Sequence, residues 1–237
     1  MISRIGPTLG TASSDVIAAC LDLAQNHAAA RVYARFRLPL SNRRAMTQHA
    51  GSPSGSNAVA AWRTDHVAFS HLLDLLDREV LAFHTGAGPN YSLMFDILRY
   101  LHEYVDRSHH PREDVAFTRL ALREPTLQLQ LARRLQEHRV VAAAAASLLT
   151  LLNGIMAGNL IARVDVERAA ATYLVYYRHH LRAEEELVIP QAAAVLTRED
   201  WLAVAAAGTT AVDPLATESI DPGYVELRRV LARACGR

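Results

Sequence analysis

Residues 104–114 read Tyr-Val-Asp-Arg-Ser-His-His-Pro-Arg-Glu-Asp, and residues 179–190 read His-His-Leu-Arg-Ala-Glu-Glu-Glu-Leu-Val-Ile-Pro. Both stretches place a glutamate four residues after a histidine, as His109 with Glu113 and His180 with Glu184. On an α-helix, residues i and i+4 lie one above the other on the same face, so each pair can hold a metal ion from one side. We call these two pairs the His-Glu clips.

A lone histidine precedes each clip at nearly the same distance. His66 lies 43 residues before His109, and His138 lies 42 residues before His180. If the chain between them folds into helical hairpins, four imidazoles and two carboxylates reach the interior at one depth. The interior of an ordinary helical bundle is aliphatic, so the pattern predicts a buried metal site.

The spacing of apolar residues predicts four long helices, over about 58–85, 92–122, 126–152 and 165–196. We expect Thr126 and Asp165 to cap the third and fourth helices, and Pro111 to kink the second or make it restart. The loops between the helices are short, which predicts an all-α fold with an up-down-up-down four-helix bundle. A short helix capped by Thr197 and Asp200, and a last one over 222–234, follow as C-terminal additions.

The chain divides into three predicted parts. Residues 1–57 form an appendage that ends in the Gly/Ser-rich linker 51–57, residues 58–197 form the bundle, and residues 198–237 form a helical extension. A start of translation at Met46 instead of Met1 remains an open alternative.

Composition narrows the class of protein. The 237 residues hold 25 basic and 24 acidic side chains, so net charge gives no reason to expect nucleic acid or an anionic membrane as the partner. Two cysteines are too few for a disulfide framework, an iron–sulfur cluster or a zinc finger. The sequence has no run of about 18 apolar residues and no export signal, which predicts a cytoplasmic protein. The unusual number is that of the histidines, 11 in all.

Residues 58–196 resemble the hemerythrin-like, or HHE cation-binding, family of four-helix bundles with a non-haem di-iron centre. The two clip sequences carry the resemblance, together with Thr64-Asp65-His66 and Gln136-Glu137-His138. It implies two iron ions per chain, joined by an oxo or hydroxo group and by the bridging carboxylates of Glu113 and Glu184. The implied ligands are His66, His109, Glu113, His138, His180 and Glu184. A register that pairs His110 with Asp114 remains an alternative for the first clip.

The remaining histidines and the nearby tyrosines have plainer interpretations. His102 lies seven residues before His109, so it could donate to a bridging carboxylate or line the site. Core packing is the expected role of Tyr173, Tyr176 and Tyr177, with a place beside the irons as the alternative. The residues expected at the surface or next to ligands are His71, His84, His110 and His179, and those in the appendage are His27 and His49.

The resemblance also bears on function. Oxygen carriers of the family have a second histidine four residues after the first on the third helix, where this chain has Ala142. Six protein ligands leave positions for O2, NO or peroxide, which implies binding or sensing of O2 or NO, or a role in oxidative or nitrosative stress. Both an enzyme and a non-enzymatic binder fit this pattern.

Three alternatives remain. One is an iron-homeostasis or regulatory protein with structural metal and a surface that binds a partner. A second is iron–sulfur-centre repair, whose family members usually carry an N-terminal module with paired cysteines that this chain lacks. The third is a helical interaction module with accidental histidines.

Overall fold

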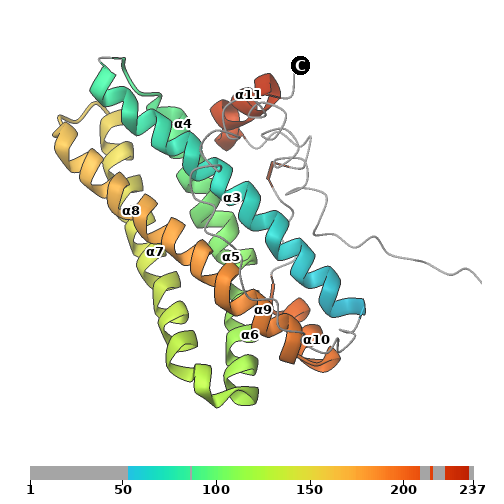
Figure 1. The fold of residues 1–237 in the computed structure, drawn as a ribbon. Coiled ribbons are helices and arrows are strands. Elements are labelled where there is room, and N and C mark those ends of the chain that lie inside the picture. The colour runs from blue at the N-terminus through green and yellow to red at the C-terminus, as the bar shows by residue number, and fades with distance from the viewer. Residues whose placement is uncertain (1–52, 86, 209–213, 216–221, 235–237) are drawn as a thin grey trace, which may run out of the picture.

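The fold is all-helical, as predicted, throughout the part of the chain that the computed structural model describes, residues 53–85, 87–208, 214–215 and 222–234 (Figure 1). The predicted appendage lies outside the described residues up to residue 52. The elements are α3 (Pro53–Thr85), α4 (Tyr91–Tyr100), η2 (Leu101–Val105), α5 (Asp106–Ser108), α6 (His110–Arg123), η3 (Pro125–Leu127), α7 (Gln128–Met156), α8 (Arg163–Ala183), η4 (Glu184–Val188), α9 (Ile189–Val195), α10 (Arg198–Ala207), η5 (Pro222–Tyr224) and α11 (Val225–Ala234).

Four long helical segments make up the body of the molecule. They are α3, the run from α4 to α6, α7, and the run from α8 to α9. Helix α3 packs against α4 and α8, and α7 packs against the same two helices. The second and fourth segments also meet, where α6 packs against α9. Helix α3 begins at Pro53, inside the stretch 51–57 that the sequence analysis assigned to a linker.

Prolines interrupt two of the four segments near the clips. Pro111 has no backbone N–H, and the helix ends at Ser108 and restarts at His110, as predicted. Pro190 stands at the same place in α9. Both segments also contain a five-residue π-helical turn, Leu101–Val105 and Glu184–Val188. Such turns change which residues face inward, because they insert extra chain into the regular helix.

The predicted caps have mixed outcomes. The capping box of α10 is confirmed, since Asp200 Oδ2 accepts from the Thr197 N–H at 2.9 Å and the Thr197 hydroxyl accepts from the Asp200 N–H. The other two predictions are wrong. Thr126 lies within a 3₁₀ turn and α7 begins after Leu127. Asp165 lies in the first turn of α8, whose N-cap is Ala162, and there its charge favours the helix dipole.

The core consists of two apolar clusters that lie at different levels of the bundle. The larger cluster takes Leu72, Leu98, Leu148 and Leu174 from the four segments in turn. The smaller takes Trp62, Phe117, Leu131 and Ile189 from the same segments. Burial of each such side chain stabilises the fold by about 1.5–3 kcal/mol. In every segment, the residues between the two clusters include the predicted metal ligands.

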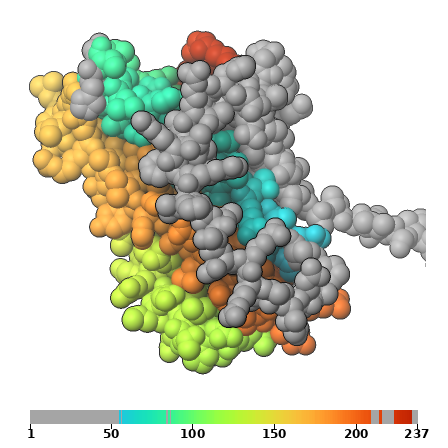
Figure 2. All heavy atoms as spheres, viewed as in Figure 1, coloured from blue at the N-terminus to red at the C-terminus, as the bar shows by residue number. Residues whose placement is uncertain are grey.

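Helix α10 covers the smaller cluster at one end of the molecule. Trp201 packs edge-to-face on Trp62 with ring centroids 5.5 Å apart, and the first turns of α3 lie beside α10 in the space-filling view (Figure 2). Gly55 permits the close approach of the first turn of α3 to α10, because a Cβ at that position would lie 2.7 Å from Trp201 Nε1.

One described stretch, Pro125–Met156, reaches the length and apolar character of a membrane span, with 22% of its most apolar window buried. This is a weak indication, because core helices of soluble proteins also pass such a test. Helix α7 belongs to the bundle, where it packs against α4, α6 and α8.

Helix α11 is held against α4 by one buried carboxylate. Asp96 Oδ2 accepts from the backbone N–H groups of Glu226 at 2.9 Å and Leu227 at 3.1 Å, in the first turn of α11. Burial raises the pKa of Asp96 even though these bonds and Arg99 oppose the rise.

We expect Asp96→Ala to loosen α11, because two backbone donors lose their acceptor. Loss of a side-chain cap costs about 0.5–2 kcal/mol. Amide hydrogen exchange over residues 225–234 and urea denaturation measure the effect, and Asp96→Asn, which keeps an acceptor oxygen, is the control. Unchanged protection of these amides in Asp96→Ala would contradict the assignment.

Candidate metal centre

A cluster of ionisable side chains fills the level between the two apolar clusters. All six ligands predicted from the sequence are in it, and each is buried. Glu184 and His180 have no exposed surface, and the most exposed of the six, His138, is 6% exposed. Each of the four helical segments contributes one histidine, and the segments with the clips also contribute a glutamate. The hairpins therefore bring the six residues to one depth.

The two clips have the expected geometry. His109 Nε2 lies 3.0 Å from Glu113 Oε1, and His180 Nε2 lies 3.2 Å from Glu184 Oε1. The helix restart at His110 leaves the first clip intact, since the Glu113 N–H still donates to the carbonyl of His109 at 3.3 Å. Asp114 lies outside the cluster of donor atoms, so the alternative pairing of His110 with Asp114 is not formed as a clip.

The donor atoms fall into two groups that share a carboxylate. One group is His66, His109 and Glu113; the other is His110, Glu113, His138 and His180. Glu113 Oε1 lies 3.3 Å from His66 Nε2, whereas its Oε2 lies 3.4 Å from His138 Nε2. Glu184 spans the groups in the same way, with Oε2 3.6 Å from His66 Nε2 and Oε1 3.5 Å from His138 Nε2. Each carboxylate thus presents one oxygen to each group.

A second set of carboxylates holds the outer nitrogen of each predicted ligand histidine. The Nδ1 atoms donate to Glu185 (from His66, 3.1 Å), Asp65 (from His109, 3.0 Å), Asp114 (from His138, 2.6 Å) and Glu137 (from His180, 3.3 Å). This contact fixes the proton on Nδ1 and turns the Nε2 lone pair inward, as metal-binding histidines require.

Three of these four carboxylates were not predicted as site residues, and the fourth, Asp114, was considered only as an alternative partner of His110. Each stands directly beside a predicted ligand in the sequence, in the pairs Asp65-His66, Glu113-Asp114, Glu137-His138 and Glu184-Glu185. Each binds the histidine of a different segment, not its neighbour in the sequence. The acidic residue next to each predicted ligand was therefore the available signal, but its partner depends on the order of the helices in space.

Five of the inner donor atoms have no hydrogen-bond partner among the described residues. Within the described residues, no hydrogen bond reaches His138 Nε2, His180 Nε2, Glu113 Oε2 or either oxygen of Glu184, all of which are buried. Buried polar atoms in folded proteins are nearly always satisfied, and two buried carboxylates need compensating positive charge. Imidazole and carboxylate donors converging in this way fit a cation such as iron.

Protonated histidines can supply part of that charge in the metal-free protein. Burial opposes a charge on His66, but hydrogen bonds to Glu113 and Glu185 outweigh it and raise its pKa to about 10. Burial likewise opposes a charge on His109 and His138, but neighbouring carboxylates raise their pKa to about 9 and about 12. Burial would raise the pKa of Glu113, yet His109 and the other histidines hold it well below its usual range.

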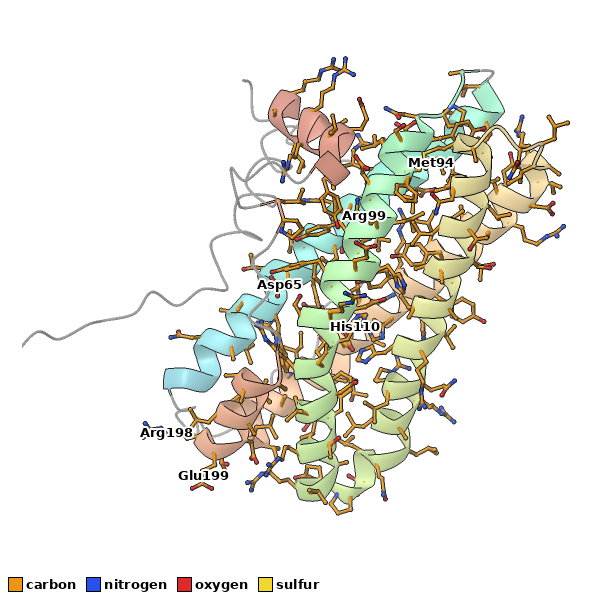
Figure 3. All side chains as sticks on the ribbon, turned by 180° about the vertical axis from the view of Figure 1, so that it is seen from behind. Asp65, Met94, Arg99, His110, Arg198 and Glu199 are labelled. Carbon is orange, nitrogen blue, oxygen red and sulfur yellow. The ribbon has the colours of Figure 1, made fainter. Side chains whose placement is uncertain are left out.

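His110 was expected at the surface or next to a ligand, and the structure places it next to a predicted ligand, stacked on His138 with ring centroids 4.2 Å apart. It is 5% exposed and belongs to the second donor group. Figure 3 shows it in the middle of the bundle, far from Arg198 and Glu199 on α10. His102 instead contacts Asp106, at 2.7 Å, and not a bridging carboxylate.

Two further described histidines, His71 and His179, are not part of either donor group. His179 is exposed, and His71 is partly buried with an unpartnered Nδ1. The side chain of His84 and the residues His27 and His49 lie outside what the structure describes.

Two of the three tyrosines are buried. Tyr173 and Tyr177 belong to the larger apolar cluster, whereas Tyr176 is exposed, contrary to the expected core packing. The Tyr177 ring centroid lies 6.2 Å from those of His110 and His180, and its buried hydroxyl has no partner in the described chain. Burial raises the pKa of Tyr177 well above its usual value, which keeps the phenol neutral.

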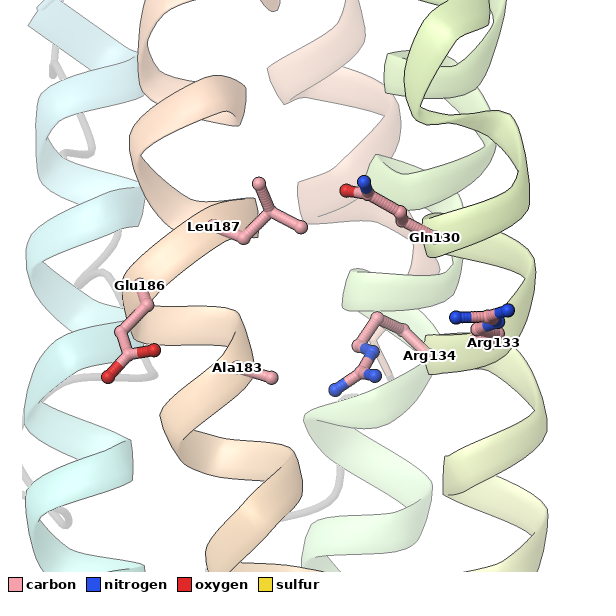
Figure 4. Close-up of a pocket in the computed structure, with 6 residues that line it drawn as sticks. All are labelled: Gln130, Arg133, Arg134, Ala183, Glu186 and Leu187. Atoms are coloured by element: carbon pink, nitrogen blue, oxygen red, sulfur yellow. The ribbon is translucent and has the colours of Figure 1, made fainter.

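A surface pocket of about 420 Å³ lies between α7 and the end of α8 (Figure 4). Its lining residues are Gln130, Arg133, Arg134, Ala183, Glu186 and Leu187. Arg134 is one helical turn before His138, and it pairs at 2.6 Å with Glu137, which holds His180. The pocket therefore lies beside the outer contacts of the second donor group.

We expect the metal-free protein to lose stability as the pH rises from about 6.5 to 9. The folded-state pKa of His66, His109 and His138 lies above the value of about 6.5 for an unfolded chain, so the folded state holds more protons in this range. The stabilising contribution of these three protonated histidines is complete below pH 6.5 and is lost as the pH rises toward their folded-state pKa values. Melting temperatures of chelator-treated protein test this, with Glu113→Gln expected to flatten the profile. A stability that is constant or rises over this range would contradict it.

Comparison with known proteins agrees with this geometry. The chain matches no curated protein and no solved structure. A family profile described as the hemerythrin HHE cation-binding domain matches residues 57–192, from just after the first turn of α3 to the middle of α9, and includes all six predicted ligands. The match spans more than half of the sequence, and the chain therefore belongs to the hemerythrin HHE cation-binding family.

Proposed function

We propose that this protein holds two iron ions and uses them to bind or sense O2 or NO, in the cytoplasm, as part of a response to oxidative or nitrosative stress. The observation that supports two ions is the placement of Glu113 and Glu184, each with one oxygen toward each donor group. A single ion would need only one of these groups. The ligands in this proposal are the six predicted from the sequence.

The order of residues along the four segments supports an up-down-up-down bundle. Along α3, Trp62 of the smaller cluster comes first, then His66, then Leu72 of the larger cluster. The second segment passes through the levels in the opposite order, from Leu98 to Phe117. The third and fourth segments repeat this alternation, which is the order expected for consecutive antiparallel helices.

The surroundings of the cluster favour a small uncharged ligand. Phe69 packs edge-to-face on His109 with centroids 5.1 Å apart, and Phe117 stacks on His138 at 5.6 Å. Trp62 lies 6.5 Å from His109 on the side of the smaller cluster. These rings exclude water and charged molecules from buried donors, whereas a diatomic molecule is small and apolar enough to enter.

The protein's own groups have distinct tasks in this proposal. The outer carboxylates orient each imidazole and keep its proton on Nδ1, so that the lone pair of Nε2 is free for a cation. The two glutamates compensate the charge of the cations inside the bundle. Iron, when bound, supplies redox chemistry and coordination positions for an exchangeable ligand.

We expect about two iron ions per chain after anaerobic reconstitution, and almost none in the double variant Glu113→Ala, Glu184→Ala. A ligand present at 100 times its dissociation constant stabilises the fold by about 2.7 kcal/mol, so iron should raise the melting temperature of the unmodified protein and of the control below, and not that of the double variant. Glu103→Ala with Glu199→Ala, which removes two exposed glutamates, is the matched control. Less than about one iron per chain, with equal melting temperatures for all three proteins, would refute the metal site.

Stopped-flow spectra of the reduced iron protein mixed with O2 or NO test the proposed ligands. We expect rapid spectral changes whose rate increases with gas concentration, because the buried site admits these molecules. A slow, unproductive reaction with both gases would instead support structural iron in a homeostatic or regulatory protein.

A further inference from the structure

We propose that the hydroxyl of Tyr177 donates a hydrogen bond to the small molecule that binds at the metal centre. This inference rests on the proposed function and adds a residue that holds the ligand of that site. Its first basis is an unused donor in the core. Tyr177 has no exposed surface, and its buried hydroxyl has no hydrogen-bond partner among the residues that the structure describes.

Packing alone gives no reason for a hydroxyl at this position. The ring of Tyr177 belongs to the larger apolar cluster, where a phenylalanine ring would bury the same apolar surface. Buried tyrosine hydroxyls usually have a hydrogen-bond partner, and a donor that is left without one destabilises the fold. The unpaired hydroxyl therefore indicates an acceptor that arrives with a bound molecule.

Tyr177 borders the second donor group. It lies three residues before His180 on α8, so the two side chains share a face of the helix, about one turn apart. The centroid of its ring lies 6.2 Å from those of His110 and His180. The phenol thus stands between the larger apolar cluster and the imidazoles of the second donor group.

The carboxylates near the hydroxyl are already engaged. Burial raises the pKa of Tyr177 most, and nearby charges, among them those of Asp106, Glu113 and Glu184, add to the rise, so the phenol keeps its proton. The two oxygens of Asp106 hold two histidines, at 2.7 and 3.1 Å. Those of Glu113 and Glu184 face the two donor groups. None of the three accepts a hydrogen bond from Tyr177, which leaves its hydroxyl available to a ligand.

A hydroxyl donor selects a ligand with an acceptor oxygen. O2 and NO each present an oxygen atom that can accept a hydrogen bond once the other atom is bound. Electron density taken from reduced iron strengthens this acceptor, because hydrogen bonds to charged groups are about twice as strong as those between neutral groups. Phe69 and Phe117, which pack on His109 and His138, offer no such donor. Tyr177 therefore adds retention of the ligand to a site whose phenylalanine rings only exclude water.

Release of NO from the reduced iron protein tests this role. Tyr177→Phe keeps the ring and removes the hydroxyl. We expect it to speed NO release about 10-fold, the factor that corresponds to loss of a hydrogen bond to a charged or strongly polarised acceptor. Tyr176→Phe, which removes an exposed hydroxyl one residue away, is the matched control and should not change the rate. Rates that are equal in all three proteins would overturn the proposal and leave the di-iron function intact.

Two further measurements separate a direct hydrogen bond from an effect on packing. The N–O stretching frequency in the unmodified protein should differ between H2O and D2O, because the hydroxyl proton exchanges, and this difference should disappear in Tyr177→Phe. The metal-free Tyr177→Phe protein should melt at the same temperature as the unmodified protein or at a higher one, since it loses an unpaired donor.

A lower melting temperature of the metal-free variant would mean that the hydroxyl has an acceptor in the fold itself, such as a buried water, and would contradict the proposal. Failure of the iron-loaded, unmodified protein to bind O2 or NO would instead refute the proposed function, and with it the role of Tyr177.

Discussion

A ring of carboxylate–imidazole hydrogen bonds joins the four helical segments, and the metal centre depends on it. Asp65 of α3 holds His109 of the second segment, Asp114 holds His138 of α7, Glu137 holds His180 of α8, and Glu185 holds His66 of α3. Each segment thus orients the histidine of the next, and the last closes the ring on the first. Because every contact crosses a helix interface, a shift of one helix misplaces two imidazoles. Packing and coordination geometry are consequently coupled in this bundle.

The ring encloses two buried carboxylates, whose negative charge must be compensated. Glu113 and Glu184 lie between apolar clusters, where an isolated charge is very costly. Histidines that take up protons can compensate it in the metal-free protein, and cations can do so more completely. A cation bound here would therefore be part of the core. Binding of a cation explains why polar residues occupy a buried level of the bundle that would otherwise be apolar.

Irregular backbone adapts the helices to this task. A continuous α-helix through residues 91–123 would separate His109 and His110 by about 100° around its axis. The π-helical turn at Leu101–Val105 and the restart of the helix at His110, just before Pro111, change the inward face over a few residues. The corresponding turn at Glu184–Val188 lies directly at the second clip, next to Pro190. The departures from helical geometry thus concentrate where the donors converge, as π-helical turns often do at functional sites.

The sequence by itself determined the helical class, the division into four long segments and the six candidate donors. These follow from local rules: apolar periodicity, breaks at proline and glycine, and the i, i+4 spacing that puts His and Glu on one face. The tertiary structure alone decided the partners of Asp65, Asp114, Glu137 and Glu185, because each binds a segment that is not its neighbour in the chain. It also decided the place of His110, whose direction depends on φ and ψ at His109 and on the ring stacked against it from α7. The spacing of residues determines which of them share a face of a helix, but contacts between helices depend on how the helices pack.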